Sequence, residues 1–220
     1  LPLPGGDAAV EHPYRLAWAY LRALGIESAG VPSLRRISPG ERQTLDTMVR
    51  RGINSPLTTS AGRLFDAAAA MLDQCWETSY EGQGAIRLEV AAQVPAVSAA
   101  PYGYELTTLA ERPLAWGLVE TRLEHTLMVG LAPLLGDLAA DIQRGTPTGE
   151  IAWRFHWTMA HIIRDIAVAE RSACQLRSVA LSGGCFQNRL LLDLAVPLLR
   201  EAGFEVLLHR QVPANDGGLA

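Results

Sequence analysis

A pair of glycines between a short apolar run and a helical pattern could directly serve a chemical role in this chain. Residues 179–181 are apolar, Ser182, Gly183 and Gly184 follow them, and residues 188–200 have a helical pattern that a proline interrupts. Glycines at such a turn let the backbone approach a ligand, because they carry no Cβ atom. The N–H groups at the start of the next helix favour an anion. The pattern therefore fits a phosphate or nucleotide loop, or an ordinary tight turn, and the glycines alone do not decide between them.

A second turn could bring an acidic side chain to the same place. Residues 204–209 fit a short strand, and the turn 212–218 follows it with Asp216 near its centre, next to Asn215 and two glycines. If this strand and the strand at 179–181 are parallel neighbours, both turns leave the same carboxyl edge of the sheet, where α/β folds bind ligands. An aspartate beside phosphates most simply holds a divalent metal ion. The alternative is an Asx turn made by Asn215 or Asp216.

Asp66 and two histidines are polar residues within predicted helices. Asp66 belongs to an alanine-rich stretch, 61–74, whose periodicity alone favours an exposed helical position for it. His156 and His161 are five residues apart in a helix predicted over about 150–170, so they lie on different faces. The four-residue spacing that lets two histidines of one helix share a metal ion is absent, and we expect core or surface histidines.

The composition limits the classes of partner and compartment. A length of 220 residues suits one large domain or two small ones, and 49% apolar residues suffice for a core. The net charge is -4 and the arginines are scattered, so nucleic acid is not an expected partner. The three cysteines have neither metal-site nor disulfide spacing, which favours a cytoplasmic protein. We find no membrane-spanning run and no signal peptide, and we expect a fragment of a longer chain because both ends fall in loops and there is no initiator Met.

The elements that must position these residues are mostly helical in the first 150 residues and alternate between strand and helix after that. We expect Asp7 to cap the first helix, Thr58 to Ser60 to supply capping hydroxyls for the third, and Pro133 and Gly136 to act as breaks. The sequence therefore predicts an α/β fold with a helical part, 1–150, and a nucleotide-binding part, 151–220. The helices are expected at 8–24, 41–51, 61–74, 85–92, parts of 118–142, 150–170 and 188–202, and the strands at 104–109, 114–119, 179–181 and 204–209.

Short motifs that occur together in one enzyme family are spread along nearly the whole chain. They are LPGGDAA at 3–9, NSP at 54–56, SAGRLFDA at 60–67, YEGQ at 80–83, FH at 155–156, LSGG at 181–184, FQN at 186–188 and PANDGG at 213–218. With them the chain resembles the C-terminal part of the HypF carbamoyltransferases of [NiFe]-hydrogenase maturation. More broadly it is similar to the Kae/TsaD/TobZ branch of the actin–sugar kinase–Hsp70 superfamily, which implies a partial actin-like ATPase (ASKHA) fold. GRLFDA and YEGQ favour HypF over its tRNA-modifying relatives, and residues 93–150 carry no motif of this kind.

The resemblance implies a nucleotide site. Gly183 and Gly184 match the glycine loop that holds nucleotide phosphates, and Asn188 matches an asparagine that helps to bind the nucleotide. Asp66 matches the acid that contacts the nucleoside at its ribose, so the resemblance replaces the exposed position with a ligand contact. Gly82 matches a glycine that lets the nucleoside approach the backbone.

The resemblance also implies a reaction. The family couples carbamoyl phosphate and ATP to carbamoyladenylate, and then passes the carbamoyl group to the C-terminal cysteine of HypE as a precursor of cyanide ligands. ATP, carbamoyl phosphate, HypE and a divalent metal ion (Mg, Zn or Fe) are therefore the expected cofactors and partners, and Asp216 matches an acidic ligand of the metal. No residue of the chain is an obvious covalent nucleophile, and Cys185 is expected to be a small hydrophobic residue.

Some family features are missing from the chain. The upstream domains and the paired-histidine metal motif are absent, so we expect this fragment alone to bind metal weakly and not to turn over. YEGQG at 80–84 replaces the more usual YEGQA, which we expect to matter little. The alternatives are a carbamoyltransferase of the same branch with an antibiotic or tRNA acceptor, and a non-catalytic fragment that binds a partner subunit.

Overall fold

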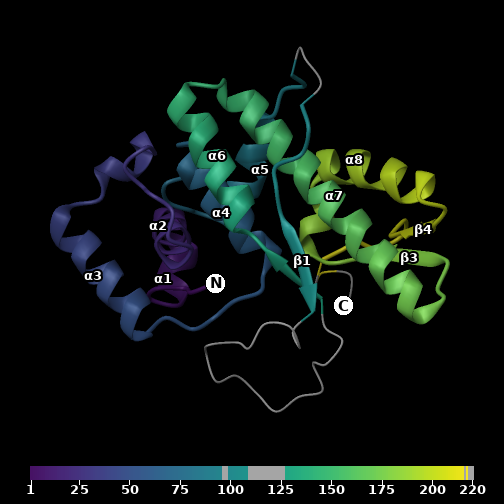
Figure 1. Ribbon diagram of the computed structural model, residues 1–220, viewed down its shortest axis with the longest axis horizontal. Coiled ribbons are helices and arrows are strands. Elements are labelled where there is room, and N and C mark those ends of the chain that lie inside the picture. Colours follow the sequence, from purple (N-terminus) through teal and green to yellow (C-terminus); the bar gives the residue numbers. More distant parts are fainter. Residues whose placement is uncertain (96–98, 109–126, 216, 218–220) are drawn as a thin grey trace.

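Helices make up most of the molecule, and a small pair of strands lies at one end of it. The computed structural model describes residues 1–95, 99–108, 127–215 and 217. In Figure 1, α1 to α6 lie on one side of the long helix α7, and α8 with the strands β3 and β4 lies on the other. The elements are α1 (Asp7–Glu11), α2 (Pro13–Ala23), the 3-10 helix η1 (Pro32–Arg36), α3 (Pro39–Arg51), α4 (Ala61–Met71), α5 (Gln83–Ala91), β1 (Glu105–Thr108), β2 (Leu127–Gly130), α6 (Ala132–Arg144), α7 (Thr148–Cys174), β3 (Ser178–Leu181), the 3-10 helix η3 (Gly184–Gln187), α8 (Arg189–Glu201) and β4 (Glu205–Leu208).

The main hydrophobic core is built around α4, which packs against both α2 and α5. The alanines at 67–70 of α4 are fully buried, and their small side chains let neighbouring helices approach closely. Larger buried side chains fill the remaining space: Tyr20 from α2, Phe65 from α4 and Phe155 from α7. The rings of Phe65 and Phe155 meet edge to face with their centroids 5.0 Å apart. The helix that carries Asp66 therefore lies within the larger of the two clusters of buried residues in the described part of the chain.

The first predicted helix is wrong in one respect, because the structure divides it in two at His12. Pro13 has no N–H group and restricts the backbone of the residue before it, so α1 ends at Glu11 and α2 begins at Pro13. The capping predictions also fail. Asp7 is the first residue of α1 rather than its cap, and Ser60 precedes α4 without a capping hydrogen bond from its side chain.

The region after residue 93 differs from the prediction more strongly. The strand expected at 104–109 is present as β1, which pairs antiparallel with β2. The strand β2 lies in the stretch 118–142, part of which was expected to be helical. Pro133 lies in the first turn of α6, where its missing N–H costs nothing, and Gly136 lies inside α6, so neither breaks the helix. The strand predicted at 114–119 lies outside the described residues.

The strands β3 and β4 confirm the predicted strand–helix–strand end of the chain. They pair in parallel, with Ser178 opposite Glu205 and Leu181 opposite Leu208, and α8 connects them. A second, smaller cluster of buried residues joins this unit to α7: Leu181, Val196, Leu199 and Phe204. The helix α8 contains Pro197 without ending there.

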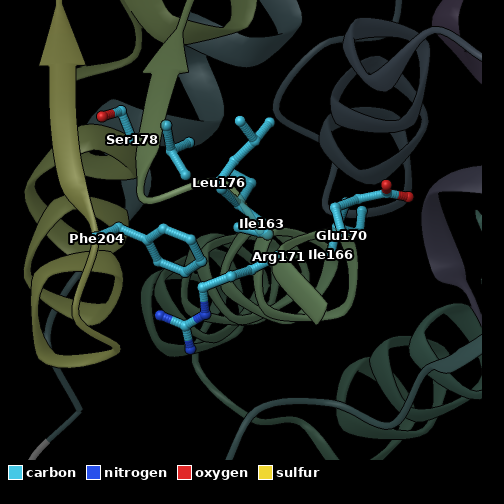
Figure 2. Close-up of a pocket in the computed structure, with 9 residues that line it drawn as sticks. Ile163, Ile166, Glu170, Arg171, Leu176, Ser178 and Phe204 are labelled. Carbon is cyan, nitrogen blue, oxygen red and sulfur yellow. The ribbon is translucent and has the colours of Figure 1, made fainter. Parts of the chain in front are cut away.

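An open groove of about 330 Å³ lies between α7 and the outer side of β3 (Figure 2). Its lining is mostly apolar, with Ile163 and Ile166 from α7 and Leu176 just before β3. At one end the guanidinium of Arg171 stacks 4.3 Å above the ring of Phe204 and donates a hydrogen bond to a backbone carbonyl. Among the described residues, no helix has the length and apolar character needed to cross a membrane.

Candidate functional site

The glycine loop leaves the carboxyl end of β3 in a conformation that favours glycine. Gly183 has φ +104°, in the region that side-chain-bearing residues rarely adopt. A Cβ atom built on Gly183 or Gly184 would meet nothing within 4 Å, so both residues border open space. Within the described residues, the N–H groups of Gly184 and Cys185 have no hydrogen-bond acceptor. Two such N–H groups beside open space form a suitable place for an anion.

The turn that follows β4 meets this loop, as the sequence predicted. The N–H of Gly183 donates to the carbonyl oxygen of Ala214 over 2.7 Å. Parallel pairing of β3 with β4 places both turns at the same edge of the sheet. Asp216, the predicted metal ligand, lies outside the described residues.

Two N–H groups in the first turn of α8 find their acceptors within the protein. Asn188 is buried, and its Oδ1 accepts the N–H of Leu191 over 2.8 Å as a helix cap. Glu89 of α5 accepts the N–H of Leu190 over 3.0 Å. These bonds engage the N–H groups of Leu190 and Leu191, two of the donors that the sequence argument had directed at a ligand.

The other end of the Asn188 amide holds His156. Its Nδ2 donates to Nε2 of His156 over 2.9 Å, and Nδ1 of His156 lies 2.7 Å from the carbonyl oxygen of Ala152. A carbonyl only accepts, so the ring hydrogen is on Nδ1 and Nε2 is the acceptor. Burial lowers the pKa of His156, which agrees with a neutral ring held inside the core. Asn188 therefore joins α7 to α8 behind the loop.

Asp66 is buried rather than exposed, contrary to the expectation from periodicity. Its side chain points inward from α4 and the residue is 2% exposed. Its Oδ2 lies 3.1 Å from Nη2 of Arg63, one turn earlier. Burial raises the pKa of the Asp66 carboxyl to about 6, although the charge of Arg63 partly opposes this. Such a carboxylate is costly to keep ionised and gains from any ligand that donates hydrogen bonds to it.

The helix α5 approaches Asp66 at a glycine. A Cβ atom on Gly84 would lie 2.5 Å from Oδ1 and 3.2 Å from Cα of Asp66, so a larger residue there would require the Asp66 side chain or its surroundings to shift. Gly84 therefore lets α5 lie close to Asp66. Gly82 is the N-cap of α5 with φ +78°, and a Cβ atom there would meet open space. The positive φ of Gly82 explains why a glycine occupies this position.

The structure brings α4 and the glycine loop together. Cys185 in η3 lies beside the start of α4, because a Cβ atom on Gly62 would be 4.0 Å from its Sγ. The charges of Arg63 and Asp66 both act on the Cys185 thiol, whose pKa is raised mainly by burial. Asp66, the glycine loop and the start of α5 thus surround one region, built from three separate motifs.

Metal ligands do not gather in the same way. Across the part of the chain that the structure describes, no group of three His, Cys, Asp or Glu side chains could hold a metal ion. His156 is engaged with Asn188, and His161 lies against the ring of Trp157. The described residues alone therefore do not fit a metal centre.

Several residues of this region were missed from the sequence. Arg63 pairs with Asp66, Glu89 caps α8, and His209 at the end of β4 lies 2.9 Å from Oγ of Ser182, measured from Nε2. Ser182 follows the predicted strand 179–181 and His209 is the last residue of the predicted strand 204–209. Their shared position at the carboxyl ends of two strands is the signal that could have identified them.

Comparisons with known proteins agree with these observations. A family model described as "Carbamoyltransferase, Kae1-like Domain, second subdomain" matches residues 1–220. "Carbamoyltransferase HypF" of Rhizobium leguminosarum bv. viciae is 37% identical over 222 residues, which cover 100% of this chain and 26% of that protein. "Carbamoyltransferase HypF2" of Cupriavidus necator is 34% identical over 238 residues, which cover 100% of this chain and 28% of that protein. The chain thus spans about a quarter of the length of these curated relatives.

Solved structures show the same fold. The crystal structure of full-length HypF in the phosphate- and nucleotide-bound form matches with a TM-score of 0.82 and 30% identity, over 99% of this chain and 31% of that one. The crystal structure of T. kodakarensis HypF matches with a TM-score of 0.74 and 23% identity, over 99% of this chain and 27% of that one. The predicted partial actin-like fold is confirmed by these matches.

Proposed function

Since the chain belongs to the HypF carbamoyltransferase family, we propose that it supplies one side of the nucleotide site of a carbamoyltransferase. The bound group is the adenylate of carbamoyladenylate, which is made from carbamoyl phosphate and ATP. Its phosphate lies at Gly183 and Gly184, and its nucleoside lies between α4 and the start of α5. The observation that carries this proposal is the glycine loop, open to solvent, beside the buried carboxylate of Asp66.

The phosphate position is supported by the geometry of the loop. The N–H groups of Gly184 and Cys185 have no acceptor among the described residues and lie beside open space. Backbone donors of this kind are already oriented and cost no rearrangement when an anion binds. The similar solved structure with 30% identity is of a phosphate- and nucleotide-bound HypF, which adds support from a relative.

The nucleoside position is supported by the chemistry of Asp66. A carboxylate accepts hydrogen bonds through both oxygens, and ribose hydroxyls are donors. The raised pKa of Asp66 means that its ionised form is destabilised by burial, and a ligand that donates hydrogen bonds to the carboxylate would offset this cost. Gly82 leaves space at the start of α5 for the nucleoside to approach the backbone.

In the proposed reaction the thiolate of the HypE C-terminal cysteine attacks the carbamoyl carbon. A C–S bond forms, the bond between the carbamoyl carbon and the phosphate oxygen breaks, and AMP leaves with the electron pair. The glycine-loop donors stabilise the charge that develops on the departing phosphate. Cys185 is a poor nucleophile because burial raises its thiol pKa, which fits an acceptor thiol supplied by another protein. The product is the carbamoylated cysteine proposed as a cyanide precursor for hydrogenase maturation.

The divalent metal remains a proposal that rests on Asp216. The described residues alone do not fit a metal centre. Further ligands would have to come from elsewhere in the complete protein. No step above depends on a metal.

Calorimetric titration of ATP with magnesium into the complete natural protein tests the nucleotide site. We expect binding by the natural protein, and a loss of at least tenfold in Asp66→Ala, because a hydrogen bond to a charged group is worth about 1.5–3 kcal/mol. Asp193→Ala on the exposed face of α8 is the matched control and should bind normally. A folded natural protein that binds no nucleotide would refute the proposal. Transfer of carbamoyl to a HypE C-terminal peptide then separates this acceptor from antibiotic or tRNA acceptors.

A further inference from the structure

Two side-chain hydrogen bonds connect β3 to β4, one at each end of the pair. At the amino end, Oγ of Ser178 donates to Oε2 of Glu205 over 2.9 Å. At the carboxyl end, Nε2 of His209 lies 2.9 Å from Oγ of Ser182. Both pairs bridge neighbouring strands, and a bridging role would be sufficient to explain the first one.

The second pair differs in its surroundings. Ser182 is the residue directly before Gly183, so its hydroxyl is at the rim of the glycine loop. Both Ser182 and His209 are exposed, and the adjacent glycines border open space. The hydrogen bond from Gly183 to Ala214 fixes this rim against the turn that follows His209. A ligand at the glycine loop would therefore lie next to Ser182.

The direction of the bond decides what Ser182 can do. A hydroxyl has one hydrogen to donate and can accept as well. If Nε2 of His209 carries the ring hydrogen, it donates to Oγ and leaves the hydroxyl hydrogen to donate elsewhere. If Nε2 is the acceptor, that hydrogen is already used.

We propose that Ser182 donates a hydrogen bond to the phosphate of the bound nucleotide, and that His209 is a positioning residue that holds the serine oxygen by donating to it. This inference rests on the proposed function and adds a side-chain donor to the backbone donors of the loop. The ligand class is a nucleoside monophosphate or its acyl derivative, read at the phosphate. Adenosine lacks the phosphate and does not use this contact.

The test compares AMP with adenosine as calorimetric ligands of the complete natural protein. Ser182→Ala is expected to weaken AMP binding roughly tenfold and to leave adenosine binding unchanged, as the loss of one hydrogen bond to a charged group predicts. His209→Ala should weaken AMP binding in the same direction and by less. His209→Gln should retain AMP binding, because its amide N–H can still donate to the serine oxygen.

Two further variants separate positioning from simple bridging. Ser178→Ala removes the equivalent strand-bridging bond at the opposite edge and should change neither ligand. The double variant Ser182→Ala, His209→Ala should bind AMP no more weakly than Ser182→Ala alone, because His209 acts through the serine.

Each contrary result has a definite meaning. If the folded natural protein binds neither AMP nor adenosine, both the proposed function and this inference fail. If it binds AMP and Ser182→Ala binds equally well, only this inference fails. An equal loss of AMP and adenosine would identify a structural bond, and a double variant weaker than Ser182→Ala would show that His209 contacts the phosphate itself; either result overturns the positioning role.

Discussion

The two sides of the proposed site rest on hydrophobic clusters of very different size. Asp66 and the start of α5 belong to the main core, where Tyr20, Phe65 and Phe155 are buried. The glycine loop belongs to the unit β3–α8–β4, whose smaller buried cluster contains four residues of the described part of the chain. The nucleoside side is therefore held by the main core, whereas the phosphate side depends on what holds the small sheet.

One helix connects the two sides. Leu191, Ala195 and Leu198 of α8 belong to the main core, and Val196 and Leu199 belong to the small cluster. The start of the same helix is held by Asn188 and by Glu89 of α5. Movement of the glycine loop relative to Asp66 would therefore have to strain the α8 contacts.

The largest expected effect is in the main core. Phe155→Ala should lower the free energy of unfolding by about 3–5 kcal/mol, because it leaves a cavity among fully packed side chains. Phe204→Ala in the small cluster should cost less, since that cluster is smaller and borders the open groove. Urea unfolding of the complete natural protein, followed by tryptophan fluorescence, measures both. Equal costs would contradict the difference between the two regions.

The connection through Asn188 should show the next largest effect. Asn188→Ala removes the cap of α8 and leaves Nε2 of His156 buried without its donor, at a combined cost of about 2–3 kcal/mol. Asn188→Asp is the matched variant, because it keeps the cap oxygen and replaces the donor with an acceptor. It should raise the pKa of His156, which NMR titration detects. An unchanged histidine pKa in Asn188→Asp would show that the amide does not hold the ring as described.

These two residues also show how far the sequence predicts the site. The glycine turn and the strand on either side of α8 follow from apolar runs and glycines, and the structure has both. Their parallel pairing was only a condition of the sequence argument, and the structure meets it. The cap formed by Asn188 was not predicted, because the expected helix began at that residue. The bond between Asn188 and His156 does not follow from the sequence either, because it joins α7 to α8 through tertiary packing that no local pattern encodes.

Burial of Asp66 was hidden from the sequence for a related reason. Its stretch is apolar on nearly every side, so periodicity does not tell which face is covered when helices pack on both sides of α4. The close approach of α5 at Gly84 is likewise a contact between two motifs. The resemblance to a family pointed to Asp66 where the physical pattern did not.

The pH dependence of stability that Asp66 causes tests the nucleoside side of the site alone. Its folded pKa of about 6 lies above the ordinary value for an aspartate, so the folded protein binds the proton more tightly than the unfolded chain. The free-energy cost of burying the ionised carboxylate is therefore fully present above about pH 6, and the free energy of unfolding rises as the pH falls from about 6 toward 4. Asp66→Asn should remove about 2 kcal/mol of this pH dependence. Urea unfolding midpoints of both proteins, measured from pH 4 to 7, test this prediction. If the midpoints of the two proteins change with pH by the same amount, Asp66 titrates normally.

The smallest expected effect concerns the exposed face of the small sheet. Leu207 of β4 is 49% exposed, although parallel strands are normally covered on both faces. The two curated relatives named above are about four times as long as this chain, so we expect other parts of the complete protein to cover this face. Leu207→Lys should then cost about 1–2 kcal/mol in the complete natural protein, as the loss of a covered leucine predicts.

Ile53 provides the matched control for Leu207. It is 51% exposed in the loop after α3, where no sheet needs a cover, and Ile53→Lys should change stability by less than about 0.5 kcal/mol. Thermal unfolding of the two variants side by side measures the difference. If both are neutral, the face of β4 is in contact with water, and α7 and α8 alone must hold the glycine loop against Asp66. If Leu207→Lys alone is destabilising, other parts of the complete protein cover this face of β4 and help to hold the glycine loop.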